Sequence, residues 1–159
     1  MAWWKLLTTN LRKLQQLSWS ERWLLLQAFL ALPLVSLGVR GFGLRPVHTL
    51  LANFHPLDQN LDENSGKLLL PRACAIARIV KIAARHGLWR PKCLAQSLVL
   101  WWFLRRQKID GDLRIGVQPK GGRLEAHAWI TFQGVVLNDG DDVHQRFAPF
   151  AKPIIPGQR

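Results

Sequence analysis

The chain has 159 residues, of which 48% are hydrophobic, and its 22 Lys and Arg against 10 Asp and Glu give a net charge of +12. This length favours a single domain with a substantial core. The basic surplus predicts an anionic partner: nucleic acid, a membrane surface or an acidic peptide. Two cysteines, Cys74 and Cys93, are too few for a disulfide scaffold, and no C-x-x-C pair exists to hold zinc. Because no signal-peptide cleavage pattern is present, we expect a cytoplasmic protein with free thiols.

The first clear helix begins after Ser18. Ser18 and Glu21 have the spacing of a capping box, and the pattern predicts an apolar helix over 20–37 that Pro33 kinks or ends. Residues 23–39 are strongly apolar but fall short of the roughly 20 residues that span a bilayer. We expect this segment to be buried or to face a partner, with contact to a membrane surface as the alternative.

The next part of the chain predicts two more helices and a connection. Residues 44–54 predict a short helix, and the polar stretch 55–70 predicts a surface connection. Apolar residues at helical spacing then predict a helix from Pro71 to Gly87. Cys74 belongs to the apolar set of that helix, so we expect it to be a packed thiol.

A further helix begins near Cys93, where Pro91 suits the first turn. Nearly every residue from Cys93 to Leu104 is apolar, which predicts a helix buried on most sides. The unpaired N–H groups at a helix start favour a thiolate and can hold a developing oxyanion. Cys93 is therefore either a nucleophile or a small apolar residue that fills space.

After Gly111 the apolar pattern alternates. Residues 112–119, 124–132 and 135–139 predict three antiparallel strands. Strands after a group of helices are typical of an α+β fold. His127 lies on the strand face that also carries Glu125 and Trp129, so it is either an active-site base or a half-buried structural histidine.

The turn after the second strand decides which acid meets His127. A two-residue turn at Gln133-Gly134 would place Asp139 on the wrong face and leave Asn138 as the fallback. A three-residue loop ending at Gly134 would bring His127 and Asp139 side by side, and this is the register we expect. Cys93, His127 and Asp139 together would then suit acyl transfer through a thiol. We expect no cofactor and no metal, since the acidic residues after Asn138 lack an EF-hand pattern.

Three sequence stretches resemble a known family: CLAQSLVLWWFLRRQKIDGDLRIGVQ, EAHAWI and VVLND. Over residues 71–146 the chain resembles the transglutaminase-like, papain-like cysteine protease domain of lasso-peptide biosynthesis, in its stand-alone form. The resemblance implies Cys93, His127 and Asp139 as the catalytic residues. We therefore expect a helical region over 1–70, a catalytic core over 71–150 and, because of the prolines after Phe147, an extended tail over 151–159.

The same resemblance implies an activity and its partners. Such a cysteine peptidase removes the leader from a ribosomally made precursor peptide, and a separate leader-recognition protein delivers the substrate. An ATP-dependent, asparagine-synthetase-like cyclase acts afterwards.

Two other functions fit the sequence. One is acyl transfer to an amine, as in a transglutaminase, which shares the thioester intermediate. The other is a non-enzymatic basic protein that binds a membrane surface or nucleic acid. Nucleic acid is the less favoured partner, because the basic residues are dispersed and no binding motif is present.

Overall fold

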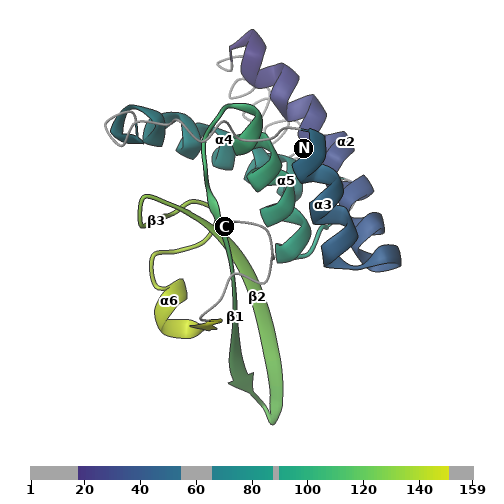
Figure 1. The fold of residues 1–159 in the computed structure, drawn as a ribbon, viewed down its shortest axis with the longest axis vertical. Helices are drawn as coiled ribbons and strands as arrows, with labels where there is room; N and C mark the ends of the chain where they lie inside the picture. Colours follow the sequence, from purple (N-terminus) through teal and green to yellow (C-terminus); the bar gives the residue numbers. More distant parts are fainter. Residues whose placement is uncertain (1–17, 55–65, 88–89, 151–159) are drawn as a thin grey trace, which may run out of the picture.

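The computed structural model describes residues 18–54, 66–87 and 90–150. Four helices form one layer, and an antiparallel sheet lies beside it (Figure 1). The sheet has the strand order β3-β2-β1-β4, so the predicted α+β class is confirmed. In chain order the elements are α2 (Trp19–Phe42), α3 (Leu44–Phe54), α4 (Gly66–His86), α5 (Cys93–Arg106), β1 (Asp112–Lys120), β2 (Arg123–Phe132), β3 (Val135–Val136), α6 (Val143–Arg146) and β4 (Ala148–Pro149).

Helix α2 begins as the sequence predicts but ends later. Ser18 and Glu21 form both bonds of the capping box. The helix then continues through Pro33 and ends at Gly43, whose φ of 85° suits glycine. A proline inside a helix costs about 3 kcal/mol. Here the buried positions continue at helical spacing on both sides of the proline, so packing outweighs that cost: they are Leu25, Ala28, Leu32 and Val35.

Helix α3 matches its prediction, whereas α4 begins at Gly66 rather than at Pro71. Leu69 and Leu70 pack partly against the core, and this burial favours helical structure before Pro71. The predicted connection is therefore shorter, and its residues 55–65 lie outside the described residues, as does the tail over 151–159.

Cys74 is exposed, so the prediction of a packed thiol was wrong. It lies next to Ala73, which is fully buried, on a helix whose buried positions include Ile76 and Ala77. Successive residues on a helix are about 100° apart. Cys74 is thus turned just off the buried stripe of α4.

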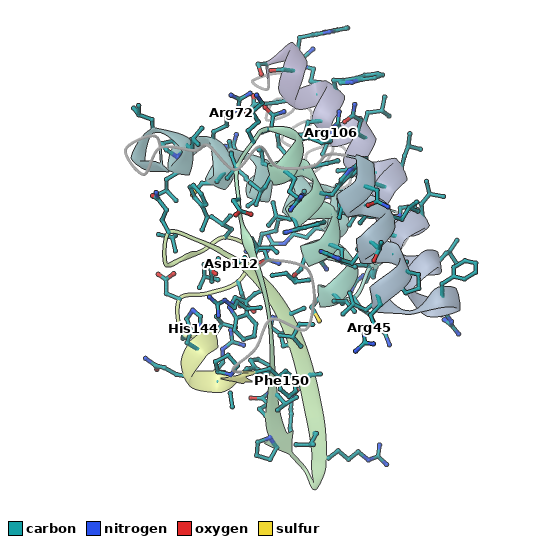
Figure 2. The ribbon with its side chains drawn as sticks, viewed as in Figure 1. Arg45, Arg72, Arg106, Asp112, His144 and Phe150 are labelled. Carbon is teal, nitrogen blue, oxygen red and sulfur yellow. The ribbon has the colours of Figure 1, made fainter. Side chains whose placement is uncertain are left out.

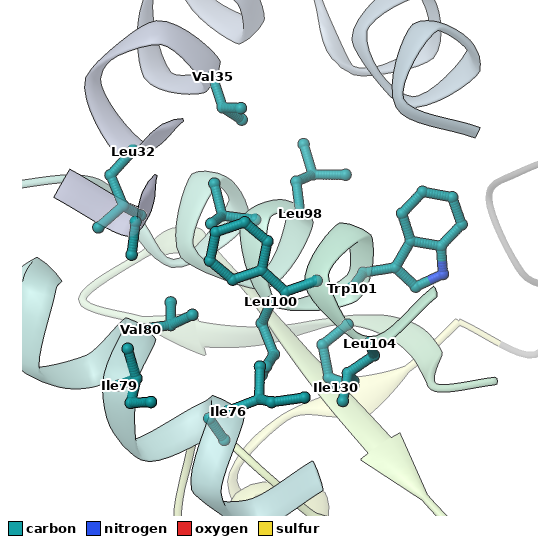
Figure 3. Close-up of a cluster of buried hydrophobic side chains, with 14 of the residues drawn as sticks. Leu32, Val35, Ile76, Ile79, Val80, Leu98, Leu100, Trp101, Leu104 and Ile130 are labelled. Carbon is teal, nitrogen blue, oxygen red and sulfur yellow. The ribbon is translucent and has the colours of Figure 1, made fainter. Parts of the chain in front are cut away.

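Helix α5 lies at the centre of the molecule and is buried on most sides, as predicted. It contacts α2 and α4 in the helical layer and β2 in the sheet. Figure 3 shows its side chains at the middle of the apolar core. Leu98, Val99, Leu100, Phe103 and Leu104 have no exposed surface.

The sheet is built on a long hairpin of β1 and β2, which pair from Asp112↔Thr131 to Lys120↔Arg123. By contrast, β3 pairs with only two residues of β2, in the register Phe132↔Val135. The predicted three-residue loop was therefore wrong. Gln133 and Gly134 form a two-residue turn with φ values of 49° and 78°, the pair of positive angles that a tight hairpin prefers.

The two faces of β2 belong to different clusters. Ala128, Ile130 and Phe132 join the core formed with the helices, whereas Trp129 packs in a second cluster with Val136, Val143 and Phe147. Figure 2 shows Arg45, Arg72 and Arg106 among the helices, and Asp112, His144 and Phe150 on the side of the sheet. The sheet thus separates the large helical core from a smaller cluster with its own side chains.

Candidate active site

Cys93 is the first residue of α5, as predicted, and is half-buried. Lys92 stands at the N-cap and makes no side-chain capping bond. Instead, the Gln96 side chain donates to the carbonyl oxygen of Pro91 at 2.8 Å, which holds the chain leading into the helix. The N–H groups of the first turn are therefore not occupied by the N-cap side chain and remain suited to an anion.

His127 lies on β2 opposite Gly116 of β1. Its ring stacks on Phe147 with 4.8 Å between centroids, on the face of the sheet that carries Trp129. His127 Nε2 contacts Asp139 Oδ2. When Nε2–H donates to the carboxylate, the lone pair of the neutral ring is on Nδ1, which can then accept a proton.

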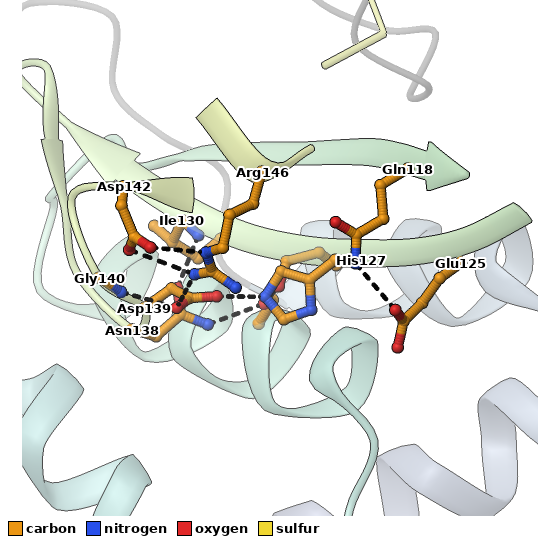
Figure 4. A network of polar contacts seen from close by, with 11 residues as sticks. Gln118, Glu125, His127, Ile130, Asn138, Asp139, Gly140, Asp142 and Arg146 are labelled. Carbon is orange, nitrogen blue, oxygen red and sulfur yellow. Dashed lines mark hydrogen bonds and ion pairs between the residues drawn. The ribbon is translucent and has the colours of Figure 1, made fainter. Parts of the chain in front are cut away.

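Asp139 reaches His127 by leaving the sheet. In the observed register a continued strand would have placed Asp139 opposite Ala128 on the wrong face. The ladder instead ends at Val136, with one further bond from Leu137 N to Ile130 O at 2.9 Å, and the chain bends over residues 137–139. The expected contact therefore forms, but through a bend rather than through the expected three-residue loop (Figure 4).

The carboxylate of Asp139 is held ionised. Desolvation by burial, the largest single effect, raises its pKa, but several hydrogen bonds together lower the pKa below its usual value. Oδ1 accepts from the backbone N–H of Gly140 at 2.7 Å and from Arg146 at 2.8 Å, while Oδ2 faces His127. Arg146 also pairs with Asp142 at 2.8 Å. An ionised, anchored carboxylate can orient an imidazole and stabilise its charged form.

The side chain of Asn138 supplies a hydrogen bond that a longer β3 would have made to β2. Its Oδ1 accepts from the backbone N–H of Ile130 at 2.8 Å, and its Nδ2 donates to Ser97 Oγ at 2.9 Å. Ser97 is fully buried and donates to the carbonyl oxygen of Ala128 at 2.9 Å. Thus Asn138 contacts α5 while the next residue, Asp139, contacts His127, and this short loop links the helix to the imidazole.

The path of α5 along β2 places Cys93 relative to this loop. Ser97 meets Ala128, and near Gly111 a Cβ atom would meet both Leu104 at 2.9 Å and Ile130 at 3.1 Å. The helix and the strand therefore run in the same direction. Cys93 lies four residues before Ser97, about 6 Å of helix, which corresponds to about two residues of strand. Two residues before Ala128 is Ala126, so along the strand axis the start of α5 lies near Ala126 and His127.

The described hydrogen bonds join His127 to Asp139 and do not join Cys93 to either. Arg146 and Ser97 are site residues that the sequence reasoning missed. Ser97 had a signal, since a serine four residues after Cys93 lies on the same helix face, whereas nothing local to Arg146 pointed to Asp139. Over residues 18–54, 66–87 and 90–150, no three His, Cys, Asp or Glu side chains gather as metal ligands would.

The comparisons with known proteins give one match. No curated protein and no solved structure matches the chain. The family model described as "Transglutaminase-like superfamily" matches residues 42–152, a range that runs from the end of α2 to beyond β4 and includes Cys93, His127 and Asp139. This range covers more than half of the sequence, and the chain belongs to the transglutaminase-like superfamily.

Proposed function

We propose that this protein is a cysteine peptidase that uses Cys93, His127 and Asp139 as its catalytic residues. The observation that carries the proposal is the contact between His127 Nε2 and an Asp139 carboxylate that Arg146 anchors. The superfamily membership supports the same class of chemistry, because a transglutaminase-like fold suggests a cysteine protease or an acyl transferase.

The first half of the proposed reaction assigns one role to each ring nitrogen of His127. His127 Nδ1 takes the thiol proton of Cys93, and the sulfur attacks the scissile carbonyl carbon. The negative charge on the carbonyl oxygen is held by backbone N–H groups of the first turn of α5. Asp139 stabilises the imidazolium through Nε2 and does not itself take the proton.

The second half regenerates the thiol. The imidazolium donates its proton to the leaving amine, the C–N bond breaks and a thioester on Cys93 remains. His127 then removes a proton from water, which attacks the thioester; the C–S bond breaks, the acid leaves and the imidazolium returns its proton to the Cys93 thiolate. If an amine replaced water, the product would be a new amide, so the same site would act as a transferase.

We propose a leader peptide as the substrate. The motifs around Cys93, His127 and Asp139 resemble those of stand-alone lasso-peptide leader peptidases, which act on a ribosomally made precursor. On this proposal a separate recognition protein delivers the leader, and an asparagine-synthetase-like cyclase uses the amine that cleavage exposes. The net charge of +12 suits an acidic leader.

The test is to incubate the full chain with a precursor peptide and a recognition protein and to weigh the products by mass spectrometry. Water as the acceptor adds 18 Da across the cleaved bond. Addition of a small primary amine tests for transfer, because the acyl product would then carry the mass of that amine. The Cys93→Ala variant should cleave the precursor at least about 10⁴-fold more slowly than the unaltered protein.

The matched control is Cys74→Ala, which removes the exposed thiol of α4. It should cleave at the rate of the unaltered protein. Equal loss in both variants, or full activity in Cys93→Ala with an unchanged circular dichroism spectrum, would contradict the proposal.

A further inference from the structure

Helix α2 has a second apolar face that no described element covers. Besides its buried residues, it carries large side chains exposed to solvent along nearly its whole length. Leu30 is 61% exposed and Leu34 is 69% exposed. The other members are Trp19, Trp23, Leu26, Leu37 and Phe42, and we call the seven residues together the α2 stripe.

The stripe has the form of a ridge. From Trp19 to Leu37 its members recur every three or four residues, which places them along one side of the helix, and Phe42 follows at the end of the helix. A helix of 24 residues is about 36 Å long. No charged residue lies between Trp23 and Arg40. An exposed apolar patch of this extent marks an interaction site.

The described charges of the helical layer are almost all of one sign. The described residues of the helical layer (18–54, 66–87 and 90–109) contain thirteen Lys and Arg against one acidic residue, Glu21. Residues 110–150, which form the sheet side, contain four basic and six acidic residues. Arg22 stands at one end of the stripe, and Arg40 and Arg45 stand at the other, all three exposed. Figure 2 shows Arg45 at the lower end of the helical layer.

The exposed apolar row and the positive charge of the helical layer together favour one kind of binding partner for the α2 stripe. A second copy would bring two strongly cationic layers face to face, which is unfavourable. A bilayer offers both an acyl region for a convex row of leucines and headgroup phosphates for the flanking arginines. Tryptophan, present at the start of the stripe, is enriched at such interfaces.

A spanning orientation fits less well than a surface one. By length and composition α2 is the one helix among the described residues that could cross a membrane. However, Leu25, Ala28, Leu32 and Val35 on its other face pack in the core and would have to leave it. We infer that α2 docks the folded protein onto the surface of an anionic lipid bilayer, with the α2 stripe in the interface and the arginines on the headgroups.

Flotation of the full chain with vesicles tests this inference, independently of any peptidase activity. Vesicles of equal phosphatidylcholine and phosphatidylglycerol should carry the protein upward, and vesicles of phosphatidylcholine alone should carry much less. Raising the salt concentration should weaken binding, because screening reduces the attraction of the arginines.

Two variants separate the apolar and the electrostatic parts. Leu30→Glu with Leu34→Glu should lower the vesicle partition coefficient by about two orders of magnitude. Arg40→Gln with Arg45→Gln keeps the stripe and should lower binding to the anionic vesicles by about tenfold. The control is Leu124→Glu, which alters a leucine that is 75% exposed on the sheet hairpin and should bind as the unaltered protein does. Circular dichroism and thermal unfolding establish that each variant is folded.

Three results would overturn the inference. The first is a folded chain that does not float with anionic vesicles. The second is flotation of the Leu30→Glu, Leu34→Glu variant at the level of the unaltered protein. The third is a dimer, seen by light scattering, that this double variant lacks, since the stripe would then be the interface between two copies.

Discussion

The helical layer and the sheet side of this molecule are stabilised in different ways. In the helical layer, α5 is surrounded by aliphatic and aromatic side chains, and few polar contacts cross between helices; one is Arg106 donating to Gln27 at 2.6 Å. On the sheet side, Asp139 bonds to His127 and Arg146, and the adjacent Asn138 bonds to Ser97 of α5. The bulk of the buried surface is therefore separate from His127 and Asp139.

This difference has a physical consequence. Apolar packing supplies most of the free energy of folding but tolerates small shifts of its members. A proton-transferring site needs directional bonds that fix each group. We therefore expect substitutions in the apolar core of the helical layer to change stability more than chemistry, and substitutions around His127 to do the reverse.

The largest effect on the sheet side is expected from Asp139→Asn. The amide keeps the shape but not the charge that stabilises the imidazolium, and loss of the equivalent carboxylate in Ser-His-Asp proteases lowers kcat by about 10⁴. The free energy of unfolding should change by less than about 1 kcal/mol, since the lost ion pair with Arg146 is partly exposed. Steady-state kinetics and urea unfolding measure the two quantities.

Asp142→Asn is the matched control for that substitution. Asp142 also pairs with Arg146 but is exposed and has no contact with His127. It should retain nearly full activity. If both variants lost activity equally, Asp139 would be acting only through Arg146.

In the helical layer, the large effect is expected on stability. Phe103 has no exposed surface, and truncation of a buried phenylalanine costs about 3–5 kcal/mol. Phe103→Ala should lower the free energy of unfolding by that amount in urea. The kcat of the molecules that remain folded should change by less than about tenfold, since Phe103 is ten residues, about 15 Å of helix, from Cys93. A large fall in kcat without a loss of stability would contradict the division between the two regions.

A smaller effect is expected where the two regions meet. Asn138→Ala leaves the N–H of Ile130 without its partner and frees Ser97 from the loop. A lost partner of a buried group costs about 1–3 kcal/mol. The kcat should also fall, whereas KM should change little, because the loop positions Asp139 and α5 rather than substrate.

A double-mutant cycle with Ser97→Ala sharpens this prediction. Two groups that bond each other should show a coupling free energy above about 0.5 kcal/mol. Strictly additive effects on both stability and kcat would show that the Ser97–Asn138 bond does not link α5 to the loop.

The same comparison explains what the sequence could predict. Helices α3 and α5 and the strand that carries His127 follow local periodicity, and their predictions are confirmed. The errors come from contacts distant in sequence. Packing of α2 continues past Pro33, and packing of Leu69 and Leu70 moves the start of α4 before Pro71.

The candidate site was harder to predict than the fold. The meeting of His127 and Asp139 was expected, but from a register that the structure does not have. Only the side chain of Asn138, bonded to both Ile130 and Ser97, lets the chain leave the ladder and bend. A side chain that replaces the hydrogen bonds of a strand leaves no periodic pattern in the sequence. Turn chemistry alone therefore predicted the wrong strand register. The roles of Cys93, His127 and Asp139 in catalysis stay predictions.

The smallest expected effect concerns pH and belongs to the helical layer. His48 on α3 is buried and lies against Trp101 of α5, with 4.3 Å between the ring centroids. Desolvation by burial, and then the nearby charge of Arg105, lower the pKa of His48 below its ordinary value. The histidine of the unfolded chain, with a pKa near 6.5, therefore binds a proton more readily than the folded one. Stability from this group is present above about pH 6.5 and is lost as the pH falls through the lower folded pKa.

His48→Phe keeps a ring against Trp101 and removes the titration. Urea unfolding at pH 8 and again at pH 5.5 should show a smaller loss of stability in the variant than in the unaltered protein. The other histidines are common to both proteins, so their contributions cancel in the difference. Parallel loss in the two proteins would mean that the pH sensitivity of folding arises elsewhere.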